Sequence, residues 1–260
     1  MSDSPALLAR LRLIAAPPVH GSAHGPAHGR RDEEPAAWFG NGLPRARVHE
    51  LHAAEPDDAA AAAGFGVAMA LAGGATPLLW LRTGAAQRQG GRLHATGLLE
   101  FGLDPQALIL AVVDDEPALL RAAADAARCP GLGTLVVEAW GRAPGIDLTA
   151  TRRLQLAAEA SGVTIMLLRV AGAPAPSAAA TRWGVTACPS TALAADAPGR
   201  PAFIIDLQRR RGGPAGQRWR VEWDRDTNSF DAAALSGAGL SLAPDRAAAV
   251  DPPAFVRRVG

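Results

Sequence analysis

The sequence predicts an α/β fold in which helices flank a mostly parallel sheet and an antiparallel hairpin extends that sheet on the C-terminal side. Three observations predict it. Apolar runs of strand length alternate with helix-length segments between residues 48 and 169. These runs are continuously apolar, which is typical of parallel strands covered on both faces and joined by right-handed crossovers. After Pro176 the segments become shorter, and the glycine-rich turn at 211–216 predicts a hairpin.

The expected elements follow one another along the chain. Strands are expected at Val48–His52, Pro77–Leu81, Ala107–Val113, Thr134–Glu138, Val163–Arg169, Arg182–Ala187, Ala202–Arg209 and Gln217–Trp223. Helices are expected at Asp57–Ala72, Leu93–Phe101, Glu116–Arg128 and Leu148–Ala160. Asp147 is placed to cap the last helix, which carries Arg152 and Arg153 near its start.

The length of 260 residues favours one domain with tails at both ends. We expect an N-terminal helical arm at 1–16, a flexible linker at 17–37, the domain itself at 38–230 and a mobile C-terminal tail at 231–260. The linker spaces His20, His24 and His28 four residues apart, but the glycines between them argue against a helix that would turn them into a metal site.

Composition excludes several classes of function. The net charge is +1, so no global basic field drives binding to nucleic acid. Cys129 and Cys188 form neither a disulfide framework nor a zinc pattern, which fits a reducing cytoplasm. No stretch approaches the ~20 apolar residues that a membrane span requires. We therefore expect no metal, no cofactor and no membrane contact.

The first strand and the loop that follows it decide whether nucleotide chemistry is expected. In α/β nucleotide-binding proteins this loop is rich in glycine and carries a lysine that reaches the phosphates. Here the loop contains Glu55, Asp57 and Asp58, it has no glycine before Gly64, and all 26 basic residues of the chain are arginines. These carboxylates can cap the start of the helix themselves, and a phosphate would meet like charge. We therefore expect no phosphate site and no catalysis there.

Glu138 is the one carboxylate in a position typical of catalysis. It ends an apolar strand, where some ATPases hold a magnesium-bound water or a catalytic base. Without a phosphate loop a structural role is the stronger interpretation, and a catalytic one stays open. His49 and His52 have no acidic partner at a suitable spacing and are interpreted as ordinary polar residues near the end of the first strand.

Two groups of residues are candidates for binding a partner protein. Trp38 and Phe39 precede the first strand, and they either lie under the sheet or anchor a partner. Arg209, Arg210 and Arg211 precede the hairpin turn. With the arginines of the returning strand they form a solvated face, a contact with an acidic protein, or a surface for nucleic acid.

Several segments resemble the ImuA family, the RecA-like member of a bacterial mutagenesis cassette. The resemblance runs from about Trp38 to Trp223. The segments that carry it are Leu148–Thr164, Pro176–Trp183, Gly42–Arg45, His49–Leu51, Phe101–Pro105 and Arg210–Gly213. The similarity to RecA itself is limited to its overall architecture and to two segments. GLPRARVHEL resembles the segment that enters the phosphate loop of RecA, and LGTLVVEAW resembles its magnesium-binding strand.

The resemblance implies a RecA-like fold and a non-catalytic adaptor in SOS-induced translesion DNA synthesis and mutagenesis. The implied partners are an ImuB-like homologue of the Y-family polymerases and RecA, with an error-prone polymerase III α subunit reached indirectly. The positions of the two RecA loops that grip DNA hold only residues 141–146 and 171–177, so DNA binding is expected to be weak. Two alternatives remain: a degenerate RecA-like ATPase that binds DNA, and a SulA-like inhibitor of cell division.

Overall fold

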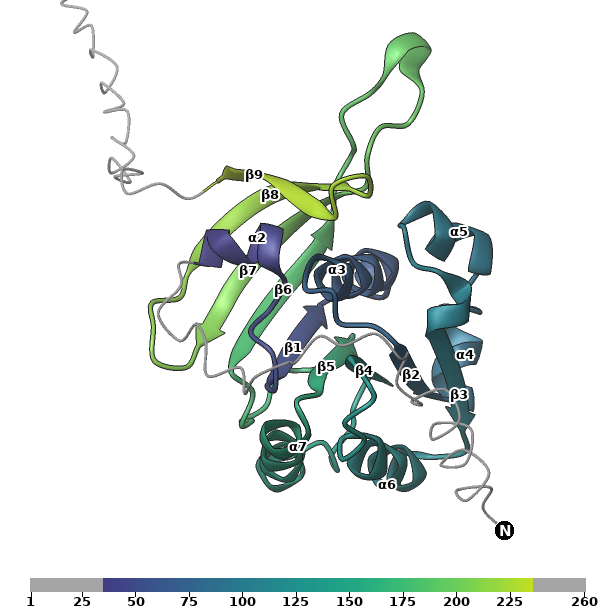
Figure 1. The fold of residues 1–260 in the computed structure, drawn as a ribbon, viewed down its shortest axis with the longest axis vertical. Coiled ribbons are helices and arrows are strands. Elements are labelled where there is room, and N and C mark those ends of the chain that lie inside the picture. The colour runs from purple at the N-terminus through teal and green to yellow at the C-terminus, as the bar shows by residue number, and fades with distance from the viewer. Residues whose placement is uncertain (1–34, 236–260) are drawn as a thin grey trace, which may run out of the picture.

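The computed structural model describes residues 35–235 and shows one nine-stranded sheet with helices on both faces (Figure 1). The strand order is β3-β2-β4-β5-β1-β6-β7-β8-β9. The strands are β1 Val48–Ala53, β2 Leu78–Thr83, β3 Leu108–Val113, β4 Thr134–Trp140, β5 Thr164–Val170, β6 Thr181–Ala187, β7 Ala202–Arg210, β8 Gln217–Asp224 and β9 Ser229–Ala234. The strands from β3 to β6 in this order are parallel, and β6 to β9 pair antiparallel. The predicted fold class is confirmed.

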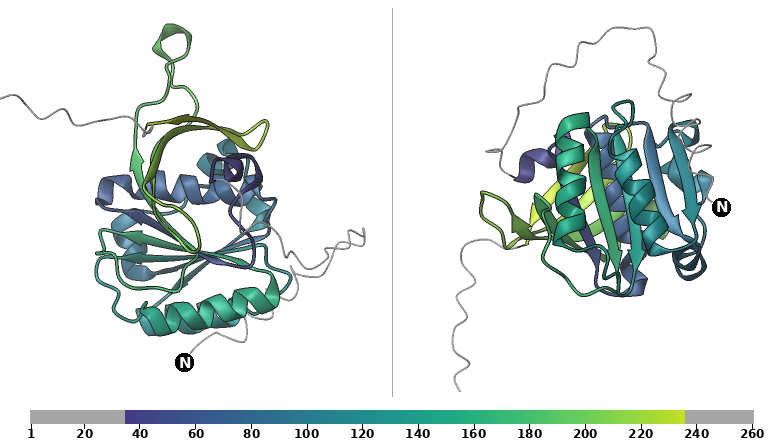
Figure 2. Two further views of the ribbon diagram at one scale, coloured as in Figure 1. Left: turned by 90° about the vertical axis from the view of Figure 1, so that its left-hand side faces the viewer. Right: turned by 90° about the horizontal axis from the view of Figure 1, so that it is seen from below.

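The helices divide between the two faces of the sheet. They are α2 Trp38–Asn41, α3 Ala59–Ala72, α4 Gly84–Gly90, α5 Ala95–Glu100, α6 Glu116–Ala126 and α7 Leu148–Ser161. Helix α3 contacts β1, β5 and β6 from one side, whereas α6 and α7 contact β2, β4, β1 and β5 from the other (Figure 2). No helix within residues 35–235 is long and apolar enough to cross a bilayer.

Each face of the sheet has its own apolar core. The core under α3 is rich in aromatic side chains, including Phe65, Trp183 and Trp223. The core under α6 and α7 is aliphatic, with side chains such as Leu79 and Ile165. Both faces of the central strands are therefore buried, which explains why these strands have continuously apolar sequences.

Helix α3 packs on the sheet through small residues. It is largely alanine, and its two glycines face neighbouring side chains. A Cβ on Gly66 would come within 2.9 Å of Cδ1 of Leu51, and a Cβ on Gly64 within 2.9 Å of Phe101. A side chain at Gly66 would therefore push the helix away from Leu51 of the sheet, and one at Gly64 would displace Phe101.

Three elements were not expected from the sequence. Helix α2 begins at Trp38 after a 3₁₀ turn at Pro35–Ala37, so the domain includes three residues that were assigned to the linker. Helix α4 follows β2 directly, with its first turn capped by Thr83. Strand β9 pairs with β8 from Ser229 to Ala234, beyond the expected domain end at residue 230. The N-terminal arm and the rest of the C-terminal tail lie outside the described residues.

Candidate functional site at the carboxyl edge of the sheet

The loop after β1 lies where α/β proteins bind phosphate, at the carboxyl end of a central parallel strand. It runs from Ala53 through a 3₁₀ turn at Pro56–Asp58 into α3. The expectation that its carboxylates cap the helix is wrong, because neither Glu55 nor Asp58 makes a capping hydrogen bond. Asp58 instead accepts a hydrogen bond from the backbone N–H of Ala187 at 2.8 Å. This carboxylate ties the loop to the exposed end of β6.

Glu138 lies at the same edge, and its carboxylate accepts hydrogen bonds from neighbouring side chains. Its Oε1 accepts hydrogen bonds from Arg82 at 2.9 Å and from the Trp140 indole at 2.6 Å. Its Oε2 accepts one from the Trp80 indole at 2.7 Å. The side chains of Arg82 and Glu138 are 2% and 5% exposed. Strand pairing explains this contact, because Arg82 of β2 lies directly opposite Glu138 of β4.

Arg82 is also held by the backbone of the following turn. Its NH1 and NH2 donate to the carbonyls of Gly91 and Ala86, at 2.8 and 2.9 Å. Gly90 leaves the space that Trp140 fills, since a Cβ there would come within 2.5 Å of that indole. The carboxylate is thus neutralised and both oxygens are used, so a metal ion would have to displace an arginine and two indoles. The geometry fits the structural interpretation of Glu138.

A second charged cluster lies on the opposite face of the sheet, beside the connection from β5 to β6. Glu50 accepts a hydrogen bond from Nε of Arg182 at 2.7 Å, and Arg182 also donates to the carbonyl of Ala175. Arg209 donates to the carbonyls of Ser177 and Ala179, at 2.9 and 2.8 Å. Burial lowers the pKa of Arg209, although Glu50 nearby opposes this shift. The two arginines therefore fix the segment from Ala175 to Ala179 to the sheet.

His49 is buried in a chain of hydrogen bonds that defines its tautomer. Its Nε2 lies 2.8 Å from the carbonyl of Pro44, which only accepts, so Nε2 carries the proton. Nδ1 then accepts from the hydroxyl of Thr181 at 2.8 Å, and that hydroxyl accepts from the Trp183 indole at 2.9 Å. Burial lowers the pKa of His49 to about 4. This histidine is a neutral structural group, and it lies inside β1 and not at the end of the strand.

His52 is buried near Glu50, yet it stays neutral. Its Nε2 lies 3.9 Å from Oε2 of Glu50 and makes no hydrogen bond with the described residues. Burial lowers the pKa of His52 to about 4, and the nearby charges of Arg182 and Arg169 add to this effect. Among residues 35–235, no three His, Cys, Asp or Glu side chains gather as metal ligands would.

Trp38 and Phe39 are part of the aromatic core. They are 3% and 2% exposed. The Trp38 ring packs against Trp183 with centroids 6.0 Å apart, and Phe39 packs against Trp219 at 5.3 Å. Of the two interpretations given to this pair, burial is the one that the structure shows, so neither side chain is a surface anchor for a partner.

The three consecutive arginines have different surroundings. Arg209 is held by the β5–β6 connection, as described above. The guanidinium of the half-buried Arg210 lies 5.1 Å from the centre of the Trp38 ring, so two predicted contact residues pack against each other. Only Arg211 is exposed. On β8, Arg220 pairs with Glu222 at 2.7 Å, which fits a solvated face with internal ion pairs better than a surface for nucleic acid.

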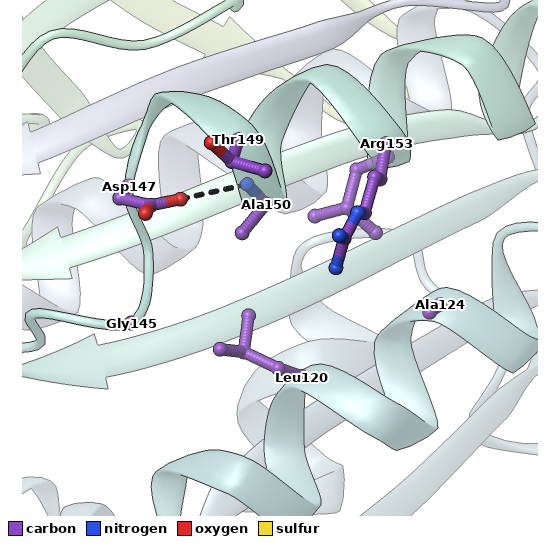
Figure 3. Close-up of a pocket in the computed structure, with 8 residues that line it drawn as sticks. Leu120, Ala124, Gly145, Asp147, Thr149, Ala150 and Arg153 are labelled. Carbon is purple, nitrogen blue, oxygen red and sulfur yellow. Dashed lines mark hydrogen bonds between the residues drawn. The ribbon is translucent and has the colours of Figure 1, made fainter.

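Sequence reasoning did not identify a groove between α6 and α7 (Figure 3). Its volume is about 250 Å³. The lining residues are Leu120 and Ala124 of α6, Gly145 and Asp147 of the preceding loop, and Thr149, Ala150, Arg153 and Leu154 of α7. Asp147 caps α7 as predicted, since its Oδ1 accepts from the N–H of Ala150 at 2.7 Å. The groove forms between two helices that are separated in the sequence, so no local sequence pattern predicts it.

Comparisons with known proteins agree with this geometry. No family model matches the chain. Two proteins called Protein ImuA, from two strains of Caulobacter vibrioides, are 35% identical over 193 residues, with 68% of this chain and 75% of each relative covered. The crystal structure of the RadB recombinase has a TM-score of 0.50 at 10% identity and covers 75% of this chain and 94% of its own. This likeness concerns the fold alone. On the strength of the ImuA relatives, the chain belongs to the ImuA family.

Proposed function

We propose that this protein is a non-catalytic RecA-like adaptor in SOS-induced translesion DNA synthesis and mutagenesis. It binds an ImuB-like homologue of the Y-family polymerases and RecA, and through them it reaches an error-prone polymerase III α subunit. Membership of the ImuA family and the RecA-like sheet support the cellular role. The proposal that the protein is non-catalytic has separate support, which comes from the residues at the carboxyl edge of the sheet.

One observation carries the proposal that the site is catalytically inactive. Glu138 is the carboxylate placed for metal or base chemistry, and Arg82 neutralises it while two indoles occupy its oxygens. A general base needs a free lone pair within reach of its substrate. A magnesium site held by one carboxylate also needs the phosphates of a substrate to complete the shell. Neither condition is compatible with a buried, saturated ion pair.

The loop after β1 supports the same conclusion by its charge. It carries Glu55, Asp57 and Asp58, and the chain has no lysine with which to contact a triphosphate. Bringing a polyanion to three carboxylates costs electrostatic energy. A protein with these residues at the carboxyl edge acts by binding other proteins and not by binding a nucleotide.

Partner binding is tested with purified proteins. The full chain, immobilised through a terminal tag, is expected to retain the ImuB homologue encoded by the same organism and, more weakly, RecA. Bovine serum albumin serves as the negative control. Retention of neither protein would refute the adaptor role.

Calorimetry separates the adaptor from a degenerate ATPase. Titration of ATP with Mg²⁺ is expected to give only heat of dilution, because no part of the carboxyl edge can take the phosphates. The discriminating variant is Glu138→Gln, which keeps the size of the side chain but leaves the buried Arg82 without its counter-ion, so the variant is compared only after circular dichroism shows that it is folded. Saturable binding in the wild type, or ATP turnover that Glu138→Gln abolishes, would favour the ATPase.

A further inference from the structure

A buried arginine on β5 lacks the partners that usually accompany burial. Arg169 is 4% exposed, and its Nε makes no hydrogen bond with any residue in the range 35–235. It forms no ion pair in that range either, whereas Arg82 and Arg182 each bind a buried glutamate. A guanidinium is always charged in proteins, and a buried charge without a counter-ion is strongly unfavourable. Arg169 therefore requires negative charge beyond what its neighbours supply.

Strand register places Arg169 in a group of charged and polar side chains. Arg169 of β5 lies opposite His52 of β1, and Glu50, two residues before His52, lies opposite Arg182 of β6. Arg182 in turn lies opposite Arg209 of β7. Paired residues on neighbouring strands, and residues two apart on one strand, point to the same face of a sheet. These five side chains come from four adjacent strands (Figure 1) and form what we call the Arg169 cluster.

The Arg169 cluster has an excess of positive charge. It contains three arginines and one carboxylate, and that carboxylate, Glu50, is already bound by Nε of Arg182 at 2.7 Å. His52 is neutral, because burial lowers its pKa to about 4. Burial also lowers the pKa of Arg169, and the carboxylates of Glu50 and Glu116 oppose this shift. Even when Glu116 is counted with the cluster, the cations outnumber the anions.

Hydrogen-bond donors without a partner gather in the same cluster. Seven buried side-chain nitrogen and oxygen atoms have no hydrogen-bond partner within the described chain, and three of them are Nε of Arg169, Nε of Arg209 and Nε2 of His52. Each arginine nitrogen is a donor, and Nε2 of His52 is one when it carries the ring proton. Buried donors are normally satisfied, so three in one place indicate a shared acceptor. A buried water satisfies a donor but brings no charge, whereas an anion also offsets the excess of cations.

The Arg169 side chain extends from β5 to two loops that approach each other closely. A Cβ on Gly172, in the connection after β5, would lie 2.6 Å from the carbonyl oxygen of Gly141, in the loop after β4. The nearest side-chain atom to that position is NH2 of Arg169, at 3.6 Å. Gly141 and Gly172 are both partly exposed. A small ion that enters between these loops therefore meets the guanidinium of Arg169.

We propose that the Arg169 cluster binds a single free oxyanion of the inorganic phosphate or sulfate type. Guanidinium groups match the oxygens of such ions. Three donors on three side chains suit a tetrahedral ion better than a carboxylate, which offers only two oxygens. The bound ion would stabilise the connection from β5 to β6, which Arg182 and Arg209 also hold.

Larger phosphate compounds fit the Arg169 cluster less well. The backbone of a nucleic acid would have to continue on both sides of the bound phosphate, where the buried residues Ser177 to Ala179 cover the sheet. The sugar and base of a nucleotide would have to pass between the loops at Gly141 and Gly172. The cluster lies on the face of the sheet opposite Glu138, and the inference does not depend on the adaptor role.

Thermal unfolding of the full chain in increasing phosphate tests the site. The midpoint of the wild type is expected to rise and then level off, because an ion that binds only the folded state stabilises it by mass action. Sodium chloride at matched ionic strength is the reference. Phosphate and sulfate also stabilise proteins by exclusion from the surface, so saturation is the criterion for a site. Isothermal titration calorimetry with phosphate is expected to give one ion per chain.

Two substitutions at position 169 test the residue itself. Arg169→Met removes the uncompensated charge, so without phosphate its midpoint is expected to equal or exceed that of the wild type, and phosphate should give no saturable rise. Arg169→Lys keeps the charge but loses the planar fork, and its affinity for phosphate is expected to fall at least about tenfold. Arg121→Met, at an exposed arginine of α6, is the matched control and should respond to phosphate as the wild type does.

Several results would overturn the oxyanion site. One is a wild-type midpoint that responds to phosphate no more than to sodium chloride, together with the absence of saturable heat in calorimetry. Another is a saturable response that Arg169→Met retains in full. A third is binding of AMP or single-stranded DNA that Arg169→Met abolishes, because the cluster would then hold the phosphate of a larger molecule. None of these results bears on the adaptor role, which the partner-binding assay tests separately.

Discussion

At the scale of single residues, buried polar groups stabilise the fold only where their partners are complete. Glu138 satisfies this condition through Arg82, Trp80 and Trp140. An intact buried ion pair contributes little net stability, because desolvation offsets most of the Coulomb energy. Removal of one partner is costly, because an uncompensated charge remains in the interior. The contact therefore makes β2 and β4 dependent on each other without stabilising them greatly.

Arg82→Met is expected to destabilise the protein by about 3–5 kcal/mol, because it leaves the buried Glu138 carboxylate without a cation. Urea denaturation followed by circular dichroism measures the change in the free energy of unfolding. Arg128→Met is the control, since Arg128 is exposed and pairs with Asp125 at 3.6 Å on the surface of its helix. Its expected cost is below about 1 kcal/mol. Equal effects of the two substitutions would contradict the structural role assigned to the pair.

The buried histidines predict a loss of stability in mild acid. Burial lowers the pKa of His49 and of His52 to about 4, from an ordinary value of 6.5. The unfolded chain therefore binds protons between these values while the folded chain does not, so stability is full above pH 6.5 and falls as the pH drops toward 4. For His49 the loss amounts to ~3 kcal/mol.

Urea midpoints measured from pH 7 to pH 4 test this behaviour. His49→Gln is expected to be less stable at pH 7, because the hydrogen bonds of the ring are disturbed, but its stability should change less with pH. His94→Gln is the control, since that residue is exposed. A wild-type stability that stays constant over this range would contradict the neutral, buried state of the two rings.

At the scale of elements, the last strand decides where the domain ends. Strand β9 carries Phe230, which is 7% exposed and packs on Trp223 with centroids 4.9 Å apart. It also contacts Phe39 of α2, at 6.1 Å. The first helix and the last strand of the described chain thus cover the same part of the aromatic core. Neither element buries enough apolar surface to be stable alone.

Two truncated chains test the domain boundary. A chain of residues 35–235 is expected to unfold cooperatively with the thermal midpoint of the full protein. A chain of residues 35–228 lacks β9 and exposes Phe39, Trp219 and Trp223, so it should lose several kcal/mol, of the order found for deleting a large core side chain. Differential scanning calorimetry and the binding of a hydrophobic dye distinguish the two. Equal midpoints would show that β9 is dispensable.

At the scale of the whole molecule, the two faces of the sheet differ in composition and in openness. Aromatic residues fill the core under α2 and α3, and the antiparallel strands β7 to β9 extend that face. The aliphatic core lies under only two long helices, α6 and α7. A groove of about 250 Å³ lies between these helices.

Much of the molecule was determined by the sequence alone. Apolar runs and turn residues act locally, so they predicted the parallel strands, the hairpin and the cap at Asp147. The lack of lysine and the carboxylates after β1 likewise predict that this loop does not bind phosphate. Helix α4, by contrast, is a short polar segment ending in two glycines, and β9 lies in a segment of alanine and polar residues. Neither carries a pattern strong enough to be recognised.

Only the tertiary structure decided which side chains are available to a partner. Trp38, Phe39 and Arg209 have the composition of a contact surface, yet strands distant in sequence supply their neighbours and enclose them. Glu138 has the sequence context of a catalytic carboxylate, and its pairing with Arg82 follows from a strand register that no local pattern encodes. The sequence thus specifies which elements form, because propensity and periodicity act over a few residues. Which side chains are exposed and which neighbours they meet depends on packing between elements, and for that reason only the folded chain shows it.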